Sequence, residues 1–348
     1  MEPLLSINQL NIQFKSDRGI AHVVRDVSFS IISGETFGLV GESGCGKSVT
    51  SRALMQLIPY PGKITGGRIL FSQHQTPNAS INITNASEKE MQQIRGQQIG
   101  MIFQEPDTAL NPIMRVGDQI SEAFFLQNKP HFNQRFISFL PDTLKHFLFS
   151  SKKAFWDKSI ELLKSLDIPD PANVVSRYPH ELSGGMKQRV LIAIALAGSP
   201  SLLISDEATS SLDVTVQSQI MRLLGQLKNK KLIQSILFIT HDLGLASMFC
   251  DRLAVMYAGC MCEIGDVPDI FLKPFHPYTH ALLETIPKKS FDTIMKPIPG
   301  QVPDLIRPSS GCRFYPRCTR SIDQCKTSLP ELVPLNSTRM VACWNMRH

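Results

Sequence analysis

One eight-residue segment constrains this chain more than any other. Residues 41–48 (GESGCGKS) fit the pattern G-x-x-x-x-G-K-[ST], between a short apolar strand at residues 36–40 and a helix expected to begin near Lys47. Glycines let backbone N–H groups wrap around a phosphate, and a helix N-terminus adds partial positive charge. The alternative to a phosphate-binding loop is a glycine-rich loop that fits the pattern by chance. We predict a triphosphate site in which Lys47 contacts the β- and γ-phosphates and Ser48 binds Mg²⁺.

The full set of predicted nucleotide-binding residues in this segment is Gly41, Glu42, Ser43, Gly44, Cys45, Gly46, Lys47, Ser48 and Val49. We interpret Cys45 as a tolerated small residue of the loop and not as a reactive thiol.

Apolar strands and amphipathic helices alternate along most of the chain. Buried strands are predicted at residues 99–103, 202–205, 235–240 and 252–257, and helices at 113–126, 156–166, 184–197 and 214–227. Loosely alternating segments at residues 4–14 and 23–31 are typical of a solvated antiparallel sheet. The spacing between Pro59 and Ile99 is irregular and predicts no element. This order indicates an α/β fold whose largely parallel sheet is covered on both faces.

Two acids follow the strand predicted at residues 202–205. Asp206 is placed to hold Mg²⁺ through water, and Glu207 to polarise the water that attacks the γ-phosphate. The alternative is an ordinary solvated strand end. The glycine loop upstream favours the catalytic interpretation.

Four more short motifs complete an ordered set. They are Gln104 in the segment FQEP, the segment LSGGM at residues 182–186, Asp213 in SSLD, and His241 in ITHD. Together with the loop and the acids, these six motifs cover roughly residues 4–265 and resemble those of ABC transporter ATPases. The resemblance implies a P-loop NTPase core with an antiparallel β subdomain and a helical subdomain, which binds ATP and Mg²⁺.

The resemblance also implies a role for each motif. Gln104 contacts Mg²⁺ or the attacking water, His241 bonds the γ-phosphate, and an aromatic residue, here assigned to Phe14, stacks on adenine. For His241 the alternative is a satisfied core histidine. Asp213 is placed at a seam between two ATPase subunits. The residues implied to act on ATP held by the other subunit are Leu182, Ser183, Gly184, Gly185 and Met186.

This chain departs from the family's pattern at two places beside the acids. Ser205 stands where an apolar residue is usual, and Ala208 where proline is usual. Neither change removes a charge or a phosphate contact, so we expect activity to survive both.

The composition excludes several classes of protein but does not identify a binding partner. Hydrophobic residues make up 43% of the 348 residues, which excludes a disordered chain and a small disulfide-stapled one. No stretch approaches the ~20 apolar residues of a membrane span, and the N-terminus has no secretory pattern, so we expect a soluble, cytosolic chain. The net charge is +6, and residues 305–348 carry seven Lys/Arg against two Asp/Glu. A basic tail alone does not distinguish nucleic acid, membrane and protein partners.

The last part of the chain resembles the extension carried by ATPases of oligopeptide and dipeptide importers. The matching segments are residues 276–283 (HPYTHALL), 299–303 (PGQVP) and 311–318 (GCRFYPRC). We therefore predict an ABC nucleotide-binding domain at residues 1–265, with a helical subdomain at about 105–200 and an insert at 128–158, followed by a small Cys-rich extension at 266–348.

The same resemblance implies partners and a location. It implies a second ABC ATPase subunit, often a different chain, two transmembrane permease subunits and, indirectly, a peptide-binding protein, but no nucleic acid. The protein is then peripheral to the cytoplasmic face of the bacterial inner membrane. The alternatives are an importer ATPase for nickel, glutathione or a cationic peptide, or a soluble ABC ATPase of translation or DNA repair. The soluble class usually carries two ATPase modules or a long coiled coil, neither of which this sequence shows.

Four cysteines cluster in the extension, at Cys312, Cys318, Cys325 and Cys343. Four thiols in a reducing compartment indicate a metal site more than disulfides. No C-x2-4-C pair typical of zinc sites is present, so the spacing leaves an iron–sulfur cluster, Zn²⁺ and free thiols open. The resemblance to peptide-importer ATPases implies a [4Fe–4S] cluster. Three arginines, Arg313, Arg317 and Arg320, either offset its negative charge or form an ordinary solvated face.

The insert at residues 128–158 combines phenylalanines with lysines. In the family this region faces the transmembrane subunits, so we expect contact with a membrane surface or a partner helix. A locally packed loop is an equal alternative.

Overall fold

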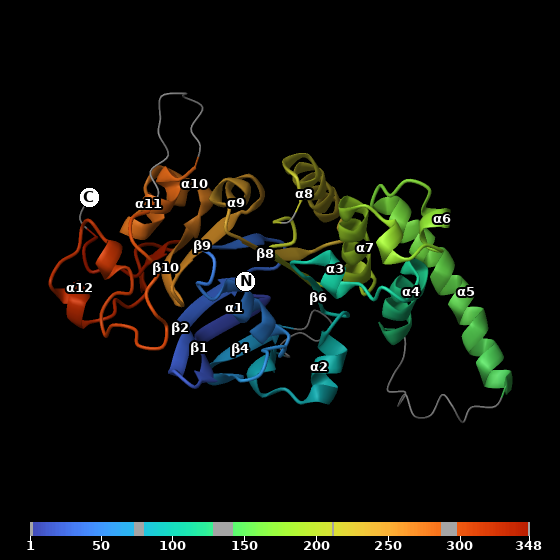
Figure 1. The fold of residues 1–348 in the computed structure, drawn as a ribbon, viewed down its shortest axis with the longest axis horizontal. Helices are drawn as coiled ribbons and strands as arrows, with labels where there is room; N and C mark the ends of the chain where they lie inside the picture. The colour runs from blue at the N-terminus through green and yellow to red at the C-terminus, as the bar shows by residue number, and fades with distance from the viewer. Residues whose placement is uncertain (1–2, 73–79, 128–141, 211, 287–297, 347–348) are drawn as a thin grey trace. The chain divides into compact units, whose positions relative to one another are not determined.

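The computed structural model describes residues 3–72, 80–127, 142–210, 212–286 and 298–346, with the side chains of residues 127 and 142–152 left aside. The chain forms two compact units (Figure 1). Unit 1 combines Met1–Met91 with Ser235–His348, and unit 2 comprises Gln92–Gln234. The predicted boundary between an ABC domain at residues 1–265 and an extension at 266–348 does not coincide with these two units, and it stays a prediction.

Unit 1 contains a four-stranded antiparallel sheet in the order β2-β1-β4-β5. Its strands are β1 (Leu5–Ser16), β2 (Gly19–Ile31), β4 (Gly62–Ser72) and β5 (Ser80–Asn82). The two predicted strands are confirmed, whereas β4 and β5 lie in the segment for which no element was predicted. The alternation of β4 is hidden by Gly66 and Gly67, which lie where the register between β1 and β4 shifts. A side chain at Gly67 would meet the backbone of Gln9, so close strand packing explains this glycine.

A second sheet of unit 1 runs in the order β11-β12-β10-β9-β3-β8. Its strands are β3 (Thr36–Val40), β8 (Ser235–Thr240), β9 (Arg252–Tyr257), β10 (Cys260–Asp266), β11 (Val333–Pro334) and β12 (Met340–Val341). β3 lies parallel to both β8 and β9, and every residue of β3 and β8 is buried. Continuous apolar strands of this kind are typical of parallel sheets covered on both faces. β10 and β12 pair antiparallel, which joins the tail to this sheet.

Short helices accompany these sheets. They are α1 (Lys47–Leu54), η1 (Ile83–Asn85), α2 (Glu88–Ile94), α9 (Leu243–Phe249), α10 (Val267–Leu272), α11 (Pro277–Glu284), η4 (Tyr315–Arg317) and α12 (Gln324–Thr327). α9 packs against β3 and β8, and α11 against β10. A buried ion pair fixes the tail here: the guanidinium of Arg339 lies 2.6 Å from the carboxylate of Glu263 in β10.

Unit 2 is mainly helical. It contains the parallel strands β6 (Ile99–Ile102) and β7 (Leu202–Asp206), and the helices α3 (Pro106–Ala109), α4 (Val116–Gln127), α5 (Asp142–Ser165), α6 (Pro171–Val174), η3 (Pro179–Glu181), α7 (Gly184–Leu196) and α8 (Val214–Asn229). α4 packs against α5 and α7, with Phe124 stacked on Phe155 at 6.3 Å between ring centroids. The predicted helices of this region are confirmed, and α5 begins earlier than expected.

The predicted membrane or partner contact of the insert is not tested. Residues 128–141 lie outside the described part of the chain, as do the side chains of residues 142–152, so the contact stays a prediction. Within the described ranges, none of the helices combines the length and the apolar character that crossing a membrane requires.

Candidate functional site

The predicted phosphate loop connects β3 to α1 in unit 1. Lys47 is only 3% exposed, and its Nζ donates hydrogen bonds to the carbonyl oxygens of Gly41 at 2.8 Å and Glu42 at 3.0 Å. The ammonium group is therefore held inside the curve of the loop. This places one positive charge where the pattern predicts phosphate oxygens.

Two glycines of the loop are required by its shape. Gly46 precedes α1 with φ of 104°, a conformation that residues with a Cβ rarely adopt, and an added Cβ would lie 2.7 Å from the carbonyl oxygen of Val23. At Gly41 an added Cβ would collide with the backbone carbonyl of Met256. The loop thus rests directly on neighbouring backbone, which fixes its path.

His241 lies at the same sheet edge as the loop. β3 and β8 are parallel neighbours with Val40 opposite Thr240, so the residues that follow each strand leave the sheet side by side. His241 is exposed, which removes the alternative of a core histidine. The next residue, Asp242, caps α9 by accepting a hydrogen bond from the Leu245 N–H at 3.1 Å. The predicted γ-phosphate contact of His241 remains a prediction.

In unit 2 the structure brings two predicted catalytic residues together. Gln104 follows β6, and Glu207 follows the parallel neighbour β7. The Gln104 Nε2 donates a hydrogen bond to the Glu207 Oε2 at 3.3 Å. Asp206, the predicted Mg²⁺ residue, is the buried last residue of β7. An amide and two carboxylates therefore gather at the carboxyl end of this strand pair, the usual ligand edge of such sheets.

Glu207 itself has a strained backbone. Its φ is 47°, in the left-handed region that is uncommon for a residue other than glycine. Its carbonyl accepts hydrogen bonds from the backbone and hydroxyl of Ser210, which support the turn. Strain of this kind is frequent at functional sites.

Ser205, one residue before the acids, has a buried hydroxyl with no hydrogen-bond partner among the described residues, which fits a position where an apolar side chain is usual.

The predicted signature segment opens α7. Ser183 is the N-cap, and its hydroxyl accepts from the Met186 N–H at 3.4 Å. At Gly185 an added Cβ would lie 3.0 Å from the Val216 side chain. The segment thus forms a helix N-terminus at which Ser183 and Gly184 are exposed, which is chemically suited to an anion. Its action on a second subunit's ATP is not tested here.

Asp213 and Phe14 have structural contacts of their own. The Asp213 carboxylate caps α8 through the N–H groups of Thr215 and Val216, at 3.0 and 2.9 Å. Phe14 lies in β1, opposite Ala21, with its ring against Gly62. The roles predicted for these two residues, at a subunit seam and on adenine, stay predictions. Ser211 of the same motif lies outside the described residues.

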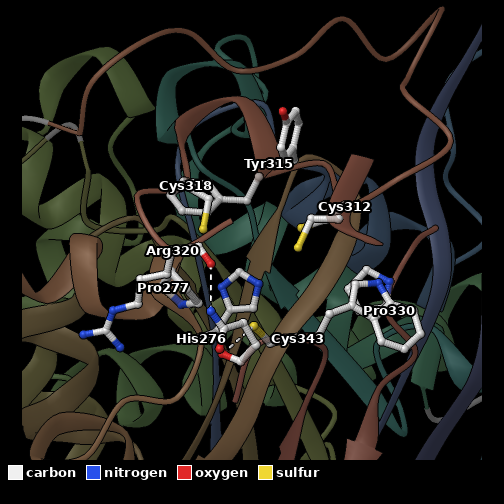
Figure 2. A pocket seen from close by; sticks show the side chains of 12 residues that line it. His276, Pro277, Cys312, Tyr315, Cys318, Arg320, Pro330 and Cys343 are labelled. Carbon is white, nitrogen blue, oxygen red and sulfur yellow. Dashed lines mark hydrogen bonds between the residues drawn. The ribbon is translucent and has the colours of Figure 1, made fainter. Parts of the chain in front are cut away.

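The four tail cysteines converge on one pocket of unit 1. Cys312, Cys318, Cys325 and Cys343 line it together with His276, a residue that sequence reasoning did not single out. Figure 2 shows the sulfurs of Cys312 and Cys318 directed toward the space where the His276 ring lies. The backbone also holds the group together, since the Cys312 N–H donates to the Cys325 carbonyl at 2.8 Å.

Burial controls the protonation of this pocket. It raises the pKa of the Cys312 thiol to about 12, with further increases from the neighbouring cysteines, and it raises the pKa of Cys318 and Cys343 as well. Burial also lowers the pKa of His276 to about 3, so its ring is neutral. The His276 Nδ1 accepts a hydrogen bond from the Tyr278 N–H at 3.0 Å, and the remaining proton is therefore on Nε2.

The arrangement of the described side chains does not support the metal site predicted at the four cysteines. Within the described ranges, no three His, Cys, Asp or Glu side chains are arranged to hold one metal ion. Of the three arginines expected near a charged cluster, only Arg320 lines the pocket. Arg313 is buried and donates to the carbonyls of His22 and Ala258 instead. Arg317 turns to the phosphate loop, where it forms an ion pair with Glu42.

Comparison with known proteins agrees with the geometry of both regions. Residues 24–210 match the family described as "ABC transporter". The chain therefore belongs to the ABC transporter family. Within it, residues 262–325 match "Oligopeptide/dipeptide transporter, C-terminal region".

Its relatives extend over nearly the whole chain. The dipeptide transport ATP-binding protein DppD of Bacillus subtilis is 43% identical over 99% of this chain and 95% of the relative. The oligopeptide transport ATP-binding protein OppD of the same organism is 44% identical over 98% of this chain and 88% of the relative.

Solved structures agree on the fold. The protein cbiO1 of Clostridium perfringens, part of an ABC transporter complex, is 28% identical with a TM-score of 0.58, over 78% of this chain and 92% of that protein. A dimeric ATP-binding cassette bound to ADP and Pi is 23% identical with a TM-score of 0.59, over 76% and 98%. The predicted P-loop core with mixed α/β sheets is confirmed.

Proposed function

We propose that this chain is the ATP-hydrolysing subunit that energises import of dipeptides or oligopeptides through separate transmembrane permease subunits. The observation that carries the proposal is that one chain combines the ABC transporter match with the peptide-transporter C-terminal match. The two Bacillus subtilis relatives described above are named for dipeptide and oligopeptide transport. The protein then acts at the cytoplasmic face of the inner membrane as a peripheral subunit.

In this proposal, different residues bind the phosphates, bind Mg²⁺, activate the attacking water and stabilise the developing charge. Lys47 and the loop N–H groups hold the phosphates, and Ser48 and Asp206 hold Mg²⁺. Glu207 accepts a proton from the attacking water, while Gln104 orients that water. His241 stabilises the charge that develops on the γ-phosphate.

The site is completed by a second ATPase subunit. The segment at residues 182–186 of each chain binds the ATP of the other, so ATP draws two chains together and product release separates them. A different but similar chain suits the second place, and a peptide-binding protein delivers the substrate to the permease.

The transport proposal predicts peptide-stimulated ATP hydrolysis. Purified with its permease subunits and the second ATPase in lipid vesicles, the protein should hydrolyse ATP faster when a binding protein loaded with a peptide is present. Nickel or glutathione supplied with their own binding protein should leave the rate unchanged. Stimulation by one of those solutes, with none by peptides, would overturn the peptide assignment.

We propose further that the tail pocket holds a [4Fe–4S] cluster. Four thiols line one pocket, which is the number of thiolates that hold such a cluster, although no three described side chains of the metal-ligating types are grouped as a metal site. Cys312, Cys318, Cys325 and Cys343 would hold the cluster, and their ligation would stabilise a tail with a small core. The neutral His276, with its proton on Nε2, lines the same pocket.

Metal analysis of anaerobically purified protein tests the cluster. We expect iron and acid-labile sulfide in equal amounts, and we expect Cys318→Ser to lower both and to make residues 298–346 more sensitive to protease. Cys250→Ser is the matched control, because Cys250 is buried in unit 1 away from the pocket. Stoichiometric zinc without iron, or normal iron in Cys318→Ser, would contradict the assignment.

A further inference from the structure

Glu42 of the phosphate loop is held by residues that lie far along the chain. Its backbone N–H donates to the hydroxyl of Tyr278 at 2.9 Å. Its carboxylate meets the guanidinium of Arg317 with two parallel hydrogen bonds, Nη1 to Oε2 at 2.8 Å and Nη2 to Oε1 at 3.1 Å. Both the backbone and the side chain of this loop residue are therefore tied to the tail region.

Arg317 is fixed in this position by its remaining donors. Its Nε donates to the Pro299 carbonyl at 2.8 Å, its Nη2 to the Ile298 carbonyl at 3.1 Å, and its Nη1 to the Tyr257 hydroxyl at 3.1 Å. With the two bonds to Glu42, all five N–H groups of the guanidinium are used. The side chain is 5% exposed. Such a pre-organised, bidentate pair is the geometry in which arginine orients a carboxylate most strongly.

The charge of Glu42 makes this pairing important for nucleotide binding. A carboxylate in a loop that receives a triphosphate repels the ligand, and because the Glu42 side chain is only 23% exposed, water screens that repulsion weakly. An unpaired carboxylate would also attract the Lys47 ammonium, whose Nζ already bonds the Glu42 carbonyl at 3.0 Å. Arg317 neutralises the carboxylate and holds it in a fixed direction.

We propose that Arg317 is a positioning residue of the nucleotide site, through which the C-terminal tail pairs the Glu42 carboxylate and keeps the phosphate loop competent for MgATP. The proposal rests on the ATP-binding function proposed above and extends it, since it makes nucleotide affinity depend on the tail. It assigns Arg317 no contact with ATP itself.

The test is a suppressor experiment on MgATP binding by the full-length protein. Arg317→Met should raise the Kd for MgATP by about tenfold, equivalent to ~1.4 kcal/mol, and raise the KM with a smaller effect on kcat. Adding Glu42→Gln to Arg317→Met should recover most of the affinity, because the double variant no longer contains an unpaired carboxylate. A merely structural role for Arg317 does not predict this recovery.

Two further variants keep the test decisive. Arg252→Met is the control, because it breaks a different arginine–carboxylate pair of unit 1, in which Arg252 lies 3.2 Å from Glu35. This variant should lower the stability of the protein without changing the Kd for MgATP. If Arg317→Met does not fold, Arg317→Lys retains the charge but loses the bidentate contact, and it should give an intermediate increase. Failure of Glu42→Gln to improve either variant would overturn the proposal. Failure of the wild-type protein to bind MgATP would instead overturn the proposed ATPase function.

Discussion

Glu207→Gln is expected to lower the rate of ATP hydrolysis by about 100- to 10,000-fold, the usual contribution of a positioned general base. Glutamine keeps the size of the side chain and the acceptor that meets Gln104 at 3.3 Å, so the change removes the charge and little else. MgATP binding should stay close to the wild-type value, because Glu207 is assigned to the water and not to the phosphates. Single-turnover hydrolysis and equilibrium binding, measured on the assembled transporter, separate the two effects.

The control for this variant is Glu161→Gln, an exposed carboxylate on α5 in the same unit. It should leave both the rate and the affinity unchanged. Hydrolysis at more than about one-tenth of the wild-type rate in Glu207→Gln would contradict the general-base role, since that residual rate exceeds what loss of such a base allows. The proton would then have to be accepted by another group, and Asp206 would be the next to test.

The sequence was sufficient to predict the strands whose carboxyl ends position the candidate site residues. The apolar runs that became β3, β7 and β8 are short and continuous, and the residues predicted to carry the chemistry follow them. Parallel pairing requires that residues at the carboxyl ends of neighbouring strands emerge at one edge, which is why Gln104 after β6 meets Glu207 after β7. Local spacing is enough when the contact follows from the topology of neighbouring strands.

Two kinds of feature were not predictable in the same way. β4 was missed because its glycines serve close packing against β1 and interrupt the period-two pattern that identifies a strand. The contacts of the tail were missed because they join residues far apart in the chain: Arg317 and Glu42 are separated by 275 positions. Arg317 was considered only as a charge near the cysteines, since nothing in the local sequence indicates which carboxylate it meets.

The protonation state of His276 also could not be predicted from the sequence, because it depends on burial in the folded chain. Its segment contributed to the resemblance with peptide-importer ATPases, but its neutral state depends on tertiary packing that lowers its pKa to about 3. The backbone N–H of His276 also donates to Glu263 at 3.0 Å, a residue that is itself paired with Arg339 of the tail. Only the folded chain shows that core, tail and thiol pocket are joined through these groups.

Lys47→Met should abolish most of the nucleotide affinity. The variant keeps an unbranched side chain of similar length in a position that is 3% exposed, so it removes the ammonium with little change in packing. A hydrogen bond to a charged group contributes about 1.5–3 kcal/mol, which corresponds to a roughly 10- to 150-fold increase in the Kd for MgATP. ATP hydrolysis and peptide uptake by the assembled transporter should fall with it, because binding precedes both.

The loop also loses two internal contacts in Lys47→Met, those to the carbonyls of Gly41 and Glu42, so its stability must be measured together with its affinity. Lys63→Met, an exposed lysine in β4 of the same unit, is the control and should change neither quantity. A folded Lys47→Met protein that binds MgATP as tightly as the wild type would show that the triphosphate is held elsewhere. Tight binding of ADP but not of ATP would restrict the lost contact to the γ-phosphate, whereas weaker binding of both would agree with the predicted contact to the β- and γ-phosphates.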